Sequence, residues 1–342
     1  MLYAISTSLH KLNLKKFLVI QTAFIGDVIL ATAVPEHLHK HFPNAQVDML
    51  VRAGNEALLT NHPFINNVLV WQKKSSKYRN LFFLIKTIRD EQYDGVINLQ
   101  RYTASALITV LSGARKTSGF DSSALSVLFS HRVKHRLGER NDSDFLHEVD
   151  RCLQLTEPWL PLEKGRPALY PSAHDFSAVS SYTDKPFVTI SPSSVWFTKQ
   201  TPVDVWRQLI GACADKQIFL LGGPGDISLC DSLARDFSHV QVLAGKLTLL
   251  QSAALMKKAV MNYTNDSAPL HLCSAMNAPV TAVFCSTIPE FGFGPLSDNA
   301  RVVQSRLELA CKPCGNHGKA ACPKGHFDCG KILLSDLMSA SA

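Results

Sequence analysis

Long hydrophobic runs are missing from this sequence of 342 residues. It contains no stretch of about eighteen apolar residues, the length that a helix needs to cross a bilayer. Lys15 and Lys16, followed by an apolar stretch to Val34, imitate a secretory signal, but Asp27 interrupts that stretch. We therefore expect a cytoplasmic protein that at most touches a membrane surface.

The common phosphate-binding signatures are also missing. No Gly-Lys-Ser/Thr loop occurs, and Gly222-Gly223-Pro224-Gly225-Asp226 lacks the spacing of a dinucleotide fingerprint. No acidic pair is spaced for Mg²⁺, and no aromatic–basic interleaving suits the stacking of bases. These absences argue against a P-loop enzyme and a nucleic-acid-binding protein, and we expect neither a cofactor nor a metal requirement.

Low-complexity tracts and short internal repeats are absent, and the composition is that of a globular protein. Hydrophobic residues make up 46% and charged residues 18%, and the length suits two domains of ordinary size. The net charge of +7 suits an acidic partner. Basic residues gather at Lys73, Lys74, Lys77 and Arg79 and again over residues 132–140. Such runs are usually solvated faces, but they also suit a phosphorylated glycolipid or an anionic membrane.

Short apolar runs alternate with helical segments in both halves, which predicts parallel sheets with crossover helices on both faces. The expected strands are Phe17–Gln21, Val47–Val51, Val68–Trp71, Gly95–Leu99, Lys116–Gly119, Phe187–Ser191, Gln217–Leu221, Val240–Leu243, Ala259–Tyr263 and Val280–Phe284. The expected helices are Asp27–His41, Glu56–Thr60, Tyr78–Glu91, Ala104–Leu111, His147–Leu155, Pro202–Ala214, Asp226–Phe237, Leu249–Lys257 and Pro269–Met276. The first of these helices is also a candidate to end before Pro35.

This alternation predicts an α/β protein with two doubly wound, Rossmann-like domains. We expect a first domain over 14–160, a linker rich in Pro, Ser and Asp over 161–185, a second domain over 186–310, and a Cys-rich tail with a C-terminal segment over 311–342.

The most informative segment is the corner at Gly26-Asp27, where an expected strand turns into a helix. Free backbone N–H groups and a positive dipole end mark such a turn, and phosphate loops often use it. An Asp there repels phosphate, so it suits a base or an orienting group beside a substrate. The alternative is a helix N-cap, which Asp serves well.

A second corner of the same kind is Asn265-Asp266-Ser267-Ala268-Pro269-Leu270-His271. Pro269 lies near the start of the helix, where its missing N–H does no harm. The N–H groups of this turn suit an anion, and Asp266 suits a hydroxyl. Ligands of open α/β sheets bind beyond the carboxyl ends of the strands. Two such corners in separate halves therefore predict a cleft that binds ligand from both sides.

Four motifs in this order resemble the family 9 glycosyltransferases, the bacterial heptosyltransferases of lipopolysaccharide core synthesis. They are Gly26-Asp27, Ser191-Pro192-Ser193-Ser194 with Thr198-Lys199, Asn265 to His271, and the tail Cys311-Lys312-Pro313-Cys314 with Cys322-Pro323-Lys324-Gly325-His326 and Cys329. The resemblance covers the chain from Lys15 to Ile332, and the tail looks like that of the heptosyltransferase II branch. It implies the GT-B arrangement, in which the two domains face each other across a cleft.

The resemblance implies that Asp27 is the general base for the acceptor hydroxyl, with inversion at the anomeric carbon. It places Lys199 at the donor diphosphate, where a lysine and helix N–H groups neutralise the leaving group without a metal. The implied donor contacts are Ser193, Thr198, Lys199, Asp226, Leu247, Asp266, Ser267, Ala268, Pro269 and His271. Acceptor contacts are expected from the first domain, at Arg52, Asn55 and Arg101, although each also suits a solvated loop.

The nine cysteines fit a reduced compartment, and five of them lie in apolar segments as core residues. The other four, Cys311, Cys314, Cys322 and Cys329, have the ligand types of a structural zinc site. Because Cys322 and Cys329 are widely spaced, a reduced clasp without metal remains an equal alternative.

Together these features predict an inverting transferase that moves heptose from an ADP-sugar donor to a lipid-linked core oligosaccharide, the inner core of a lipopolysaccharide precursor. It is expected to work in the cytoplasm, in peripheral contact with the inner membrane and without nucleic acid. A nucleotide-sugar epimerase of the same fold is one alternative, and a non-catalytic zinc-stapled binding protein is another.

Overall fold

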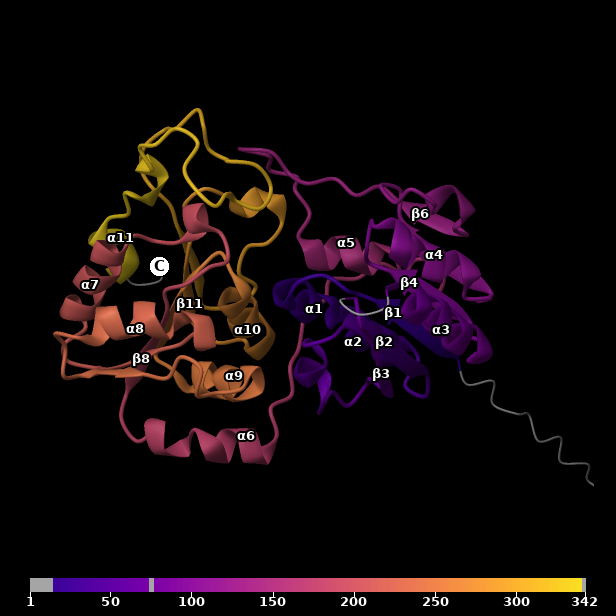
Figure 1. The fold of residues 1–342 in the computed structure, drawn as a ribbon, viewed down its shortest axis with the longest axis horizontal. Coiled ribbons are helices and arrows are strands. Elements are labelled where there is room, and N and C mark those ends of the chain that lie inside the picture. The colour runs from indigo at the N-terminus through magenta and orange to yellow at the C-terminus, as the bar shows by residue number, and fades with distance from the viewer. Residues whose placement is uncertain (1–14, 74–76, 340–342) are drawn as a thin grey trace, which may run out of the picture.

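A computed structural model describes residues 15–73 and 77–339, which form two lobes side by side (Figure 1). The N-terminal lobe holds a six-stranded parallel sheet in the order β3-β2-β1-β4-β5-β6. Its strands are β1 (Lys16–Ile20), β2 (Gln46–Arg52), β3 (Asn67–Trp71), β4 (Gly95–Asn98), β5 (Lys116–Phe120) and β6 (His131–Val133). Strands β1 and β4 are almost fully buried, which is why they read as continuous apolar runs.

The C-terminal lobe repeats this plan with the order β12-β11-β10-β7-β8-β9, again all parallel. Its strands are β7 (Phe187–Ser191), β8 (Gln217–Leu220), β9 (Val240–Val242), β10 (Met261–Asn265), β11 (Val280–Val283) and β12 (Ala300–Val303). The expected α/β class and paired doubly wound sheets are confirmed.

Helices cover both sheets. They are α1 (Ile25–Ala31), α2 (Ala33–His41), α3 (Lys77–Asp90), α4 (Thr103–Leu111), α5 (Glu148–Gln154), α6 (Ala173–Ala178), α7 (Val203–Ala212), α8 (Ile227–Ala234), α9 (Leu249–Lys258), α10 (Ala268–Met276) and α11 (Leu334–Met338). Short 3₁₀ turns are η1 (Glu56–Leu59), η2 (Ser126–Leu128), η3 (Ser180–Tyr182), η4 (Phe197–Lys199), η5 (Pro224–Asp226), η6 (Pro289–Phe291) and η7 (Asp328–Gly330).

The first helical segment differs from both expectations for it. It is neither one helix over Asp27–His41 nor a helix that ends before Pro35, because α1 and α2 meet at Thr32. The Thr32 hydroxyl donates to the Ile29 carbonyl at 2.7 Å and takes the place of a helical partner. Pro35 then lies in the first turn of α2, where a missing N–H is tolerated.

Strands β6 and β12 and helix α6 were not predicted, because their sequences show no clear hydrophobic periodicity. Strands β6 and β12 lie at sheet edges, and β6 is only three residues long. The expected linker 161–185 contains α6, whose N-cap Ser172 accepts the Asp175 N–H at 3.2 Å. We keep 14–160, 161–185, 186–310 and 311–342 as proposed domain boundaries.

Not all of the basic residues expected on a solvated face are free of protein contacts in the structure. Lys74 lies outside the described residues. In the segment 132–140, Arg136 pairs with Asp142 at 2.8 Å and Arg140 donates to the Leu309 carbonyl of the other lobe, also at 2.8 Å. Part of this basic run therefore joins the lobes. Among the described residues, no helix is both long and apolar enough to span a bilayer.

Candidate active site between the two sheets

The Gly26-Asp27 corner lies where the sequence placed it, between the end of β1 and the first turn of α1. Phe24 is the N-cap, and the Asp27 carboxylate accepts the Phe24 N–H at 3.1 Å. Asp27 thus contributes to capping from the third helical position, which leaves its second oxygen for other partners. The capping role and the role of a base are compatible at this position.

The residues expected to touch the acceptor surround this corner in different ways. Asn55 is buried and donates to the Ala23 carbonyl at 3.1 Å, so it supports the loop before α1. The Arg52 guanidinium lies 4.9 Å from the centre of the exposed Phe24 ring. Arg101 is exposed at the carboxyl end of β4. Arg52 is thus partly exposed and Arg101 exposed, whereas Asn55 is buried.

The ionisation of Asp27 is shifted toward that of a useful base. Burial, followed by the negative charge of Glu148, raises the pKa of Asp27 from its ordinary value of 3.8 to about 6, against the Phe24 N–H and Arg52. Glu148 is held in place by buried Arg151, whose Nε donates to its carboxylate at 2.7 Å. A carboxylate with this pKa is still mostly ionised at pH 7 and accepts a proton more readily than a free Asp.

The second corner is built around a buried ion pair. Lys199 Nζ lies 2.7 Å from Asp266 Oδ2, and both side chains are largely removed from water. The Thr287 hydroxyl donates to the same oxygen at 2.6 Å. Neighbouring Asn265 accepts both the N–H and the hydroxyl of Thr201. Asp266 therefore fixes the Lys199 ammonium beside the N-terminus of α10.

Helix α10 begins with Ser267 as N-cap and with Ala268 and Pro269 in its first turn. The Leu270 N–H, which the sequence left free for an anion, donates to the Ser267 carbonyl at 3.0 Å. The Ser267 and Ala268 N–H groups are the remaining candidates, since Pro269 has none.

The two corners meet at His271. A Cβ on Gly26 would lie 2.7 Å from His271 Cδ2, so only glycine allows α1 to approach the imidazole this closely. Burial lowers the pKa of His271 to about 4, with Asp266 opposing the shift. This neutral ring belongs to α10, which packs against α1 of the other lobe (Figure 1), and the charges of Asp266 and Lys199 act on it.

The remaining expected donor residues fall into three environments. The Ser193 hydroxyl donates to Asp226 at 2.6 Å, and Asp226 also accepts the Gly223 N–H, which fixes the turn after β8. Leu247 is partly buried against the core. Thr198 is 1% exposed, and its hydroxyl accepts the Lys319 N–H at 2.8 Å. These contacts give Thr198 a structural role that joins η4 to the tail.

All nine cysteines are free thiols. In the tail, burial and then Cys314 raise the pKa of Cys329 to about 11, with smaller contributions from Cys322 and Cys311, but no three of the four sulfurs lie within 4.8 Å of one another. Cys311 Sγ also lies 3.9 Å from His326 Nε2. Whether these four thiols hold zinc or form a reduced clasp stays a prediction.

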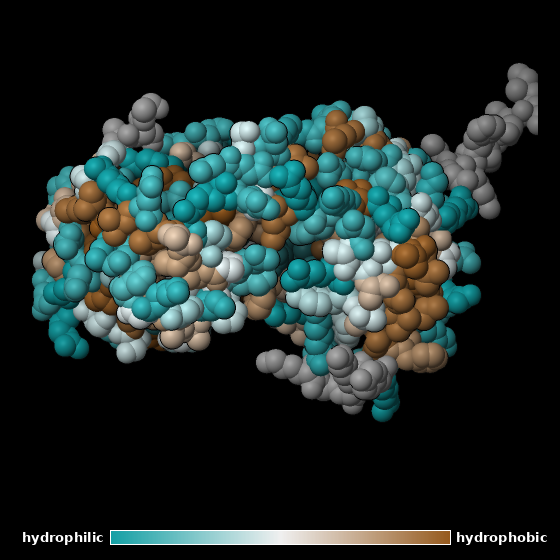
Figure 2. Space-filling view, turned by 90° about the horizontal axis from the view of Figure 1, so that it is seen from above, coloured by the Kyte–Doolittle hydropathy of each residue, from teal (hydrophilic) through white to brown (hydrophobic). Residues whose placement is uncertain are grey.

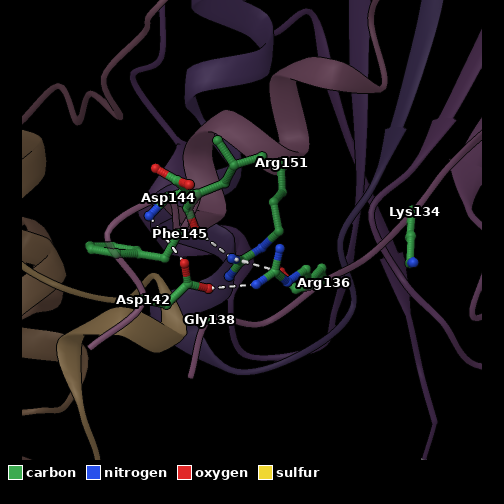
Figure 3. A pocket seen from close by; sticks show the side chains of 8 residues that line it. Lys134, Arg136, Gly138, Asp142, Asp144, Phe145 and Arg151 are labelled. Carbon is green, nitrogen blue, oxygen red and sulfur yellow. Dashed lines mark hydrogen bonds and ion pairs between the residues drawn. The ribbon is translucent and has the colours of Figure 1, made fainter. Parts of the chain in front are cut away.

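A hollow of about 90 Å³ opens at the segment between β6 and α5 (Figure 3). Arg136 and Arg151 point into it, and Asp142 pairs with Arg136. The same Arg151 donates to the Phe291 carbonyl of the other lobe at 2.7 Å. Asp27, Lys199 and Asp266 do not line the hollow, so it lies apart from both corners.

Sequence reasoning did not identify Glu148, Arg151 or Thr287. Thr287 follows β11, so the rule that sites lie beyond strand ends could have identified it. Glu148 offered no such signal, because it acts on Asp27 from a helix more than a hundred residues away along the chain.

A model described as glycosyltransferase family 9 (heptosyltransferase) matches residues 81–323. The chain belongs to glycosyltransferase family 9. Lipopolysaccharide heptosyltransferase 3 of Escherichia coli (strain K12) is 28% identical over 295 residues, 77% of this chain and 80% of that one. Lipopolysaccharide heptosyltransferase 2 of the same strain is 24% identical over 318 residues, 84% and 88% of the two chains.

The fold of this family 9 glycosyltransferase matches that of a solved relative. The E. coli ADP-heptose lipopolysaccharide heptosyltransferase II superposes with a TM-score of 0.72 at 21% identity, over 92% of this chain and 96% of that one. The expected family and GT-B architecture are thus confirmed. Relatives from more than one heptosyltransferase group match, so the comparison supports the family without selecting a branch.

Proposed function

We propose that this family 9 glycosyltransferase moves heptose from ADP-heptose to the inner core of a lipopolysaccharide precursor, with inversion at the anomeric carbon. The main support for the proposal is the close contact between the two corners at Gly26 and His271. Asp27, whose pKa is raised, lies on one corner, and Lys199 is paired with Asp266 of the other. The names of the relatives, lipopolysaccharide heptosyltransferases 2 and 3, support the substrate class.

In the proposed reaction, Asp27 accepts the proton of the acceptor hydroxyl as that oxygen attacks the anomeric carbon. The bond from that carbon to the diphosphate breaks in the same displacement, which inverts the configuration. A base with a pKa near 6 provides both ionisation at pH 7 and a driving force for late proton transfer.

The leaving diphosphate is the proposed partner of Lys199 and of the Ser267 and Ala268 N–H groups. In the structure Lys199 is held by Asp266, so the ammonium is already in position before the donor arrives. Asp266 then serves as a positioning residue for Lys199 and as an acceptor for a donor hydroxyl. Fixed positive charge of this kind stabilises the diphosphate without a metal, and we propose metal-independent transfer.

The rest of the donor is assigned to the C-terminal lobe. Ser193 and Asp226 at the turn after β8 are proposed to bind the ribose, with Leu247 beside the base. The acceptor is assigned to the open edge of the N-terminal lobe near Arg52 and Arg101.

Peripheral membrane contact is proposed through helix α3. Phe82 and Phe83 are 74% and 70% exposed, and Arg79, Lys86 and Arg89 on the same helix are exposed as well. Figure 2 shows hydrophobic surface of this kind on the N-terminal lobe, at its right. Because α3 starts at the carboxyl end of β3, an anionic membrane bound there would present a lipid-linked acceptor to the sheet edge that carries Asp27.

Vesicle flotation tests this contact. Phe82→Ser/Phe83→Ser should lose binding to vesicles that contain anionic lipid, whereas Val260→Ser, a change at a 51% exposed position on the C-terminal lobe, should not. Equal vesicle binding by the parent protein, the Phe82/Phe83 double variant and Val260→Ser would contradict the assignment of membrane contact to α3.

The proposed function is tested by calorimetric titration with ADP, UDP and GDP in the presence of a chelator, followed by a product assay with ADP-heptose. Selective ADP binding that survives the chelator supports a metal-free ADP-sugar transferase. Preference for UDP or GDP would overturn the donor. Turnover of the donor without an acceptor would favour an epimerase, and no nucleotide binding at all would favour the non-catalytic binding protein.

A further inference from the structure

A group of metal-ligand side chains lies away from the active site, where the chain leaves the N-terminal lobe. His37 and His41 are one turn apart on α2, and Glu163 comes from the connection toward the C-terminal lobe. One ligand atom from each of the three lies within 4.8 Å of the other two. Among residues 15–73 and 77–339, no other group of three or more His, Cys, Asp or Glu side chains meets this criterion.

Further contacts hold His37 and Glu163 in place. His37 is 4% exposed, and its ring packs edge-on against the His41 ring with 4.9 Å between the ring centroids. Its Nε2 lies 3.2 Å from the Pro161 carbonyl, the kind of second contact that commonly orients a metal-bound imidazole. One oxygen of Glu163 pairs with the Lys40 ammonium, and the other faces His41.

The same cluster joins two parts of the chain. The connection runs along α2, with the Ala168 N–H donating to Thr32 at 2.9 Å and the Tyr170 hydroxyl donating to Glu36 at 2.8 Å. Glu163 and His41 face each other at 3.4 Å at the far end of this contact, and both remain partly open to water. A cation there would have two imidazoles and a carboxylate from the protein and water at its open positions.

We propose that His37, His41 and Glu163 bind a divalent transition metal of the zinc type and thereby fasten the connection between the lobes to α2. Two imidazoles and one carboxylate suit such a borderline cation better than Mg²⁺ or Ca²⁺, which prefer oxygen ligands. The metal takes the place of the Lys40 ammonium beside Glu163. An ion-pair cluster in which Lys40 and His41 hold Glu163 without a metal is the competing explanation.

The test is calorimetric titration of the chelator-treated full-length protein with Zn²⁺, together with thermal unfolding with and without Zn²⁺. The cysteine tail is intact in every variant, so any zinc bound there is common to all of them. We expect His41→Ala and Glu163→Gln each to lose one equivalent of zinc relative to the parent protein. His174→Ala, which removes an exposed histidine of α6 outside the cluster, should bind like the parent.

Two further measurements separate the metal site from an ion-pair cluster. Lys40→Met removes the competing cation, so it should tighten zinc binding, whereas an ion-pair cluster predicts no gain. Zinc should also raise the unfolding temperature more in the parent than in Glu163→Gln, since a ligand of the native state stabilises it by mass action. Equal stoichiometry in the parent, His41→Ala and Glu163→Gln would overturn the proposal. Glu163 is a surface residue, so its variant stays informative if His41→Ala folds poorly.

Discussion

Replacing Asp27 with asparagine should stabilise this protein near neutral pH while strongly lowering its transfer activity. The shift in the pKa of Asp27 from 3.8 to about 6 means that folding favours its protonated form. That contribution to stability is fully present below pH 3.8 and is lost as the pH rises through about 6. At pH 7.5 the ionised carboxylate therefore lowers the free energy of unfolding, and the neutral amide of Asp27→Asn avoids this.

The size of the effect follows from the same shift. Each step of one in pKa is worth about 1.4 kcal/mol, so a rise of about two gives an upper bound of about 3 kcal/mol. Asp27 keeps some contact with water, so the measured gain should be smaller. The amide oxygen can still accept the Phe24 N–H, which preserves the cap. Transfer should fall by about a hundredfold or more, the usual size of a lost general base.

The assay is denaturant unfolding of parent and variant at pH 7.5 and pH 4.5, with initial rates of transfer measured alongside. The gain in stability should shrink toward pH 4.5. Asp175→Asn is the matched control, because Asp175 also accepts the N–H of its own N-cap, Ser172, but lies in α6 away from the site. A variant of Asp27 that is less stable than the parent, or equally stabilised at both pH values, would refute the electrostatic reasoning.

Glu148 provides a second test of the same electrostatics. Its negative charge helps to raise the pKa of Asp27, so Glu148→Gln should lower that pKa. The acid limb of the pH–rate profile for kcat/KM should then move to lower pH. Glu148→Asp, which keeps the charge, should leave the limb closer to that of the parent. An unmoved limb in Glu148→Gln would show that burial alone sets the ionisation of Asp27.

Three further changes probe the rest of the site. Gly26→Ala forces a methyl group against His271 and should destabilise the fold by about 1–3 kcal/mol in denaturant unfolding, with partial recovery in the double variant with His271→Ala. Lys199→Met should weaken ADP by about tenfold or more in calorimetry and leave Asp266 unpaired, and adding Asp266→Asn should recover stability but not ADP affinity. Cys322→Ser should release one equivalent of zinc in elemental analysis if the tail is a zinc site, and an unchanged metal content would identify it as a reduced clasp.

Local sequence patterns were sufficient to locate both corners. Buried parallel strands read as apolar runs, and the turns after them are marked by Gly26, Asp27, Asp266 and Pro269, so both segments could be found without a structure. The break at Thr32 was missed because a side-chain hydroxyl replaces a helical partner there, and this leaves no periodic signal. The edge strands β6 and β12, of three and four residues, were also missed, whereas the equally short edge strand β9 was found within the run Val240–Leu243.

What the sequence could not supply are contacts between residues far apart along the chain. The Lys199–Asp266 pair and the Gly26–His271 contact both depend on how loops from distant strands come together. Thr198 shows the same limit. It occupies a motif position that the family resemblance assigns to the donor, yet the fold brings Lys319 onto its hydroxyl.

The contacts between the two lobes involve Glu148, which acts on the pKa of Asp27, and its partner Arg151. Arg151 holds Glu148, whose charge acts on Asp27, and the same guanidinium donates to the Phe291 carbonyl of the C-terminal lobe. The Glu148 N–H donates to the Gly292 carbonyl at 2.7 Å, and a Cβ on Gly292 would lie 2.6 Å from Arg151. Glu148 and Asp27 belong to the same lobe, so these contacts connect the C-terminal lobe to the side chain and backbone of Glu148 and not to Asp27 itself. In this arrangement Arg151, which contacts the C-terminal lobe, also holds the Glu148 charge that adds to burial in raising the pKa of Asp27, the residue proposed to activate the acceptor.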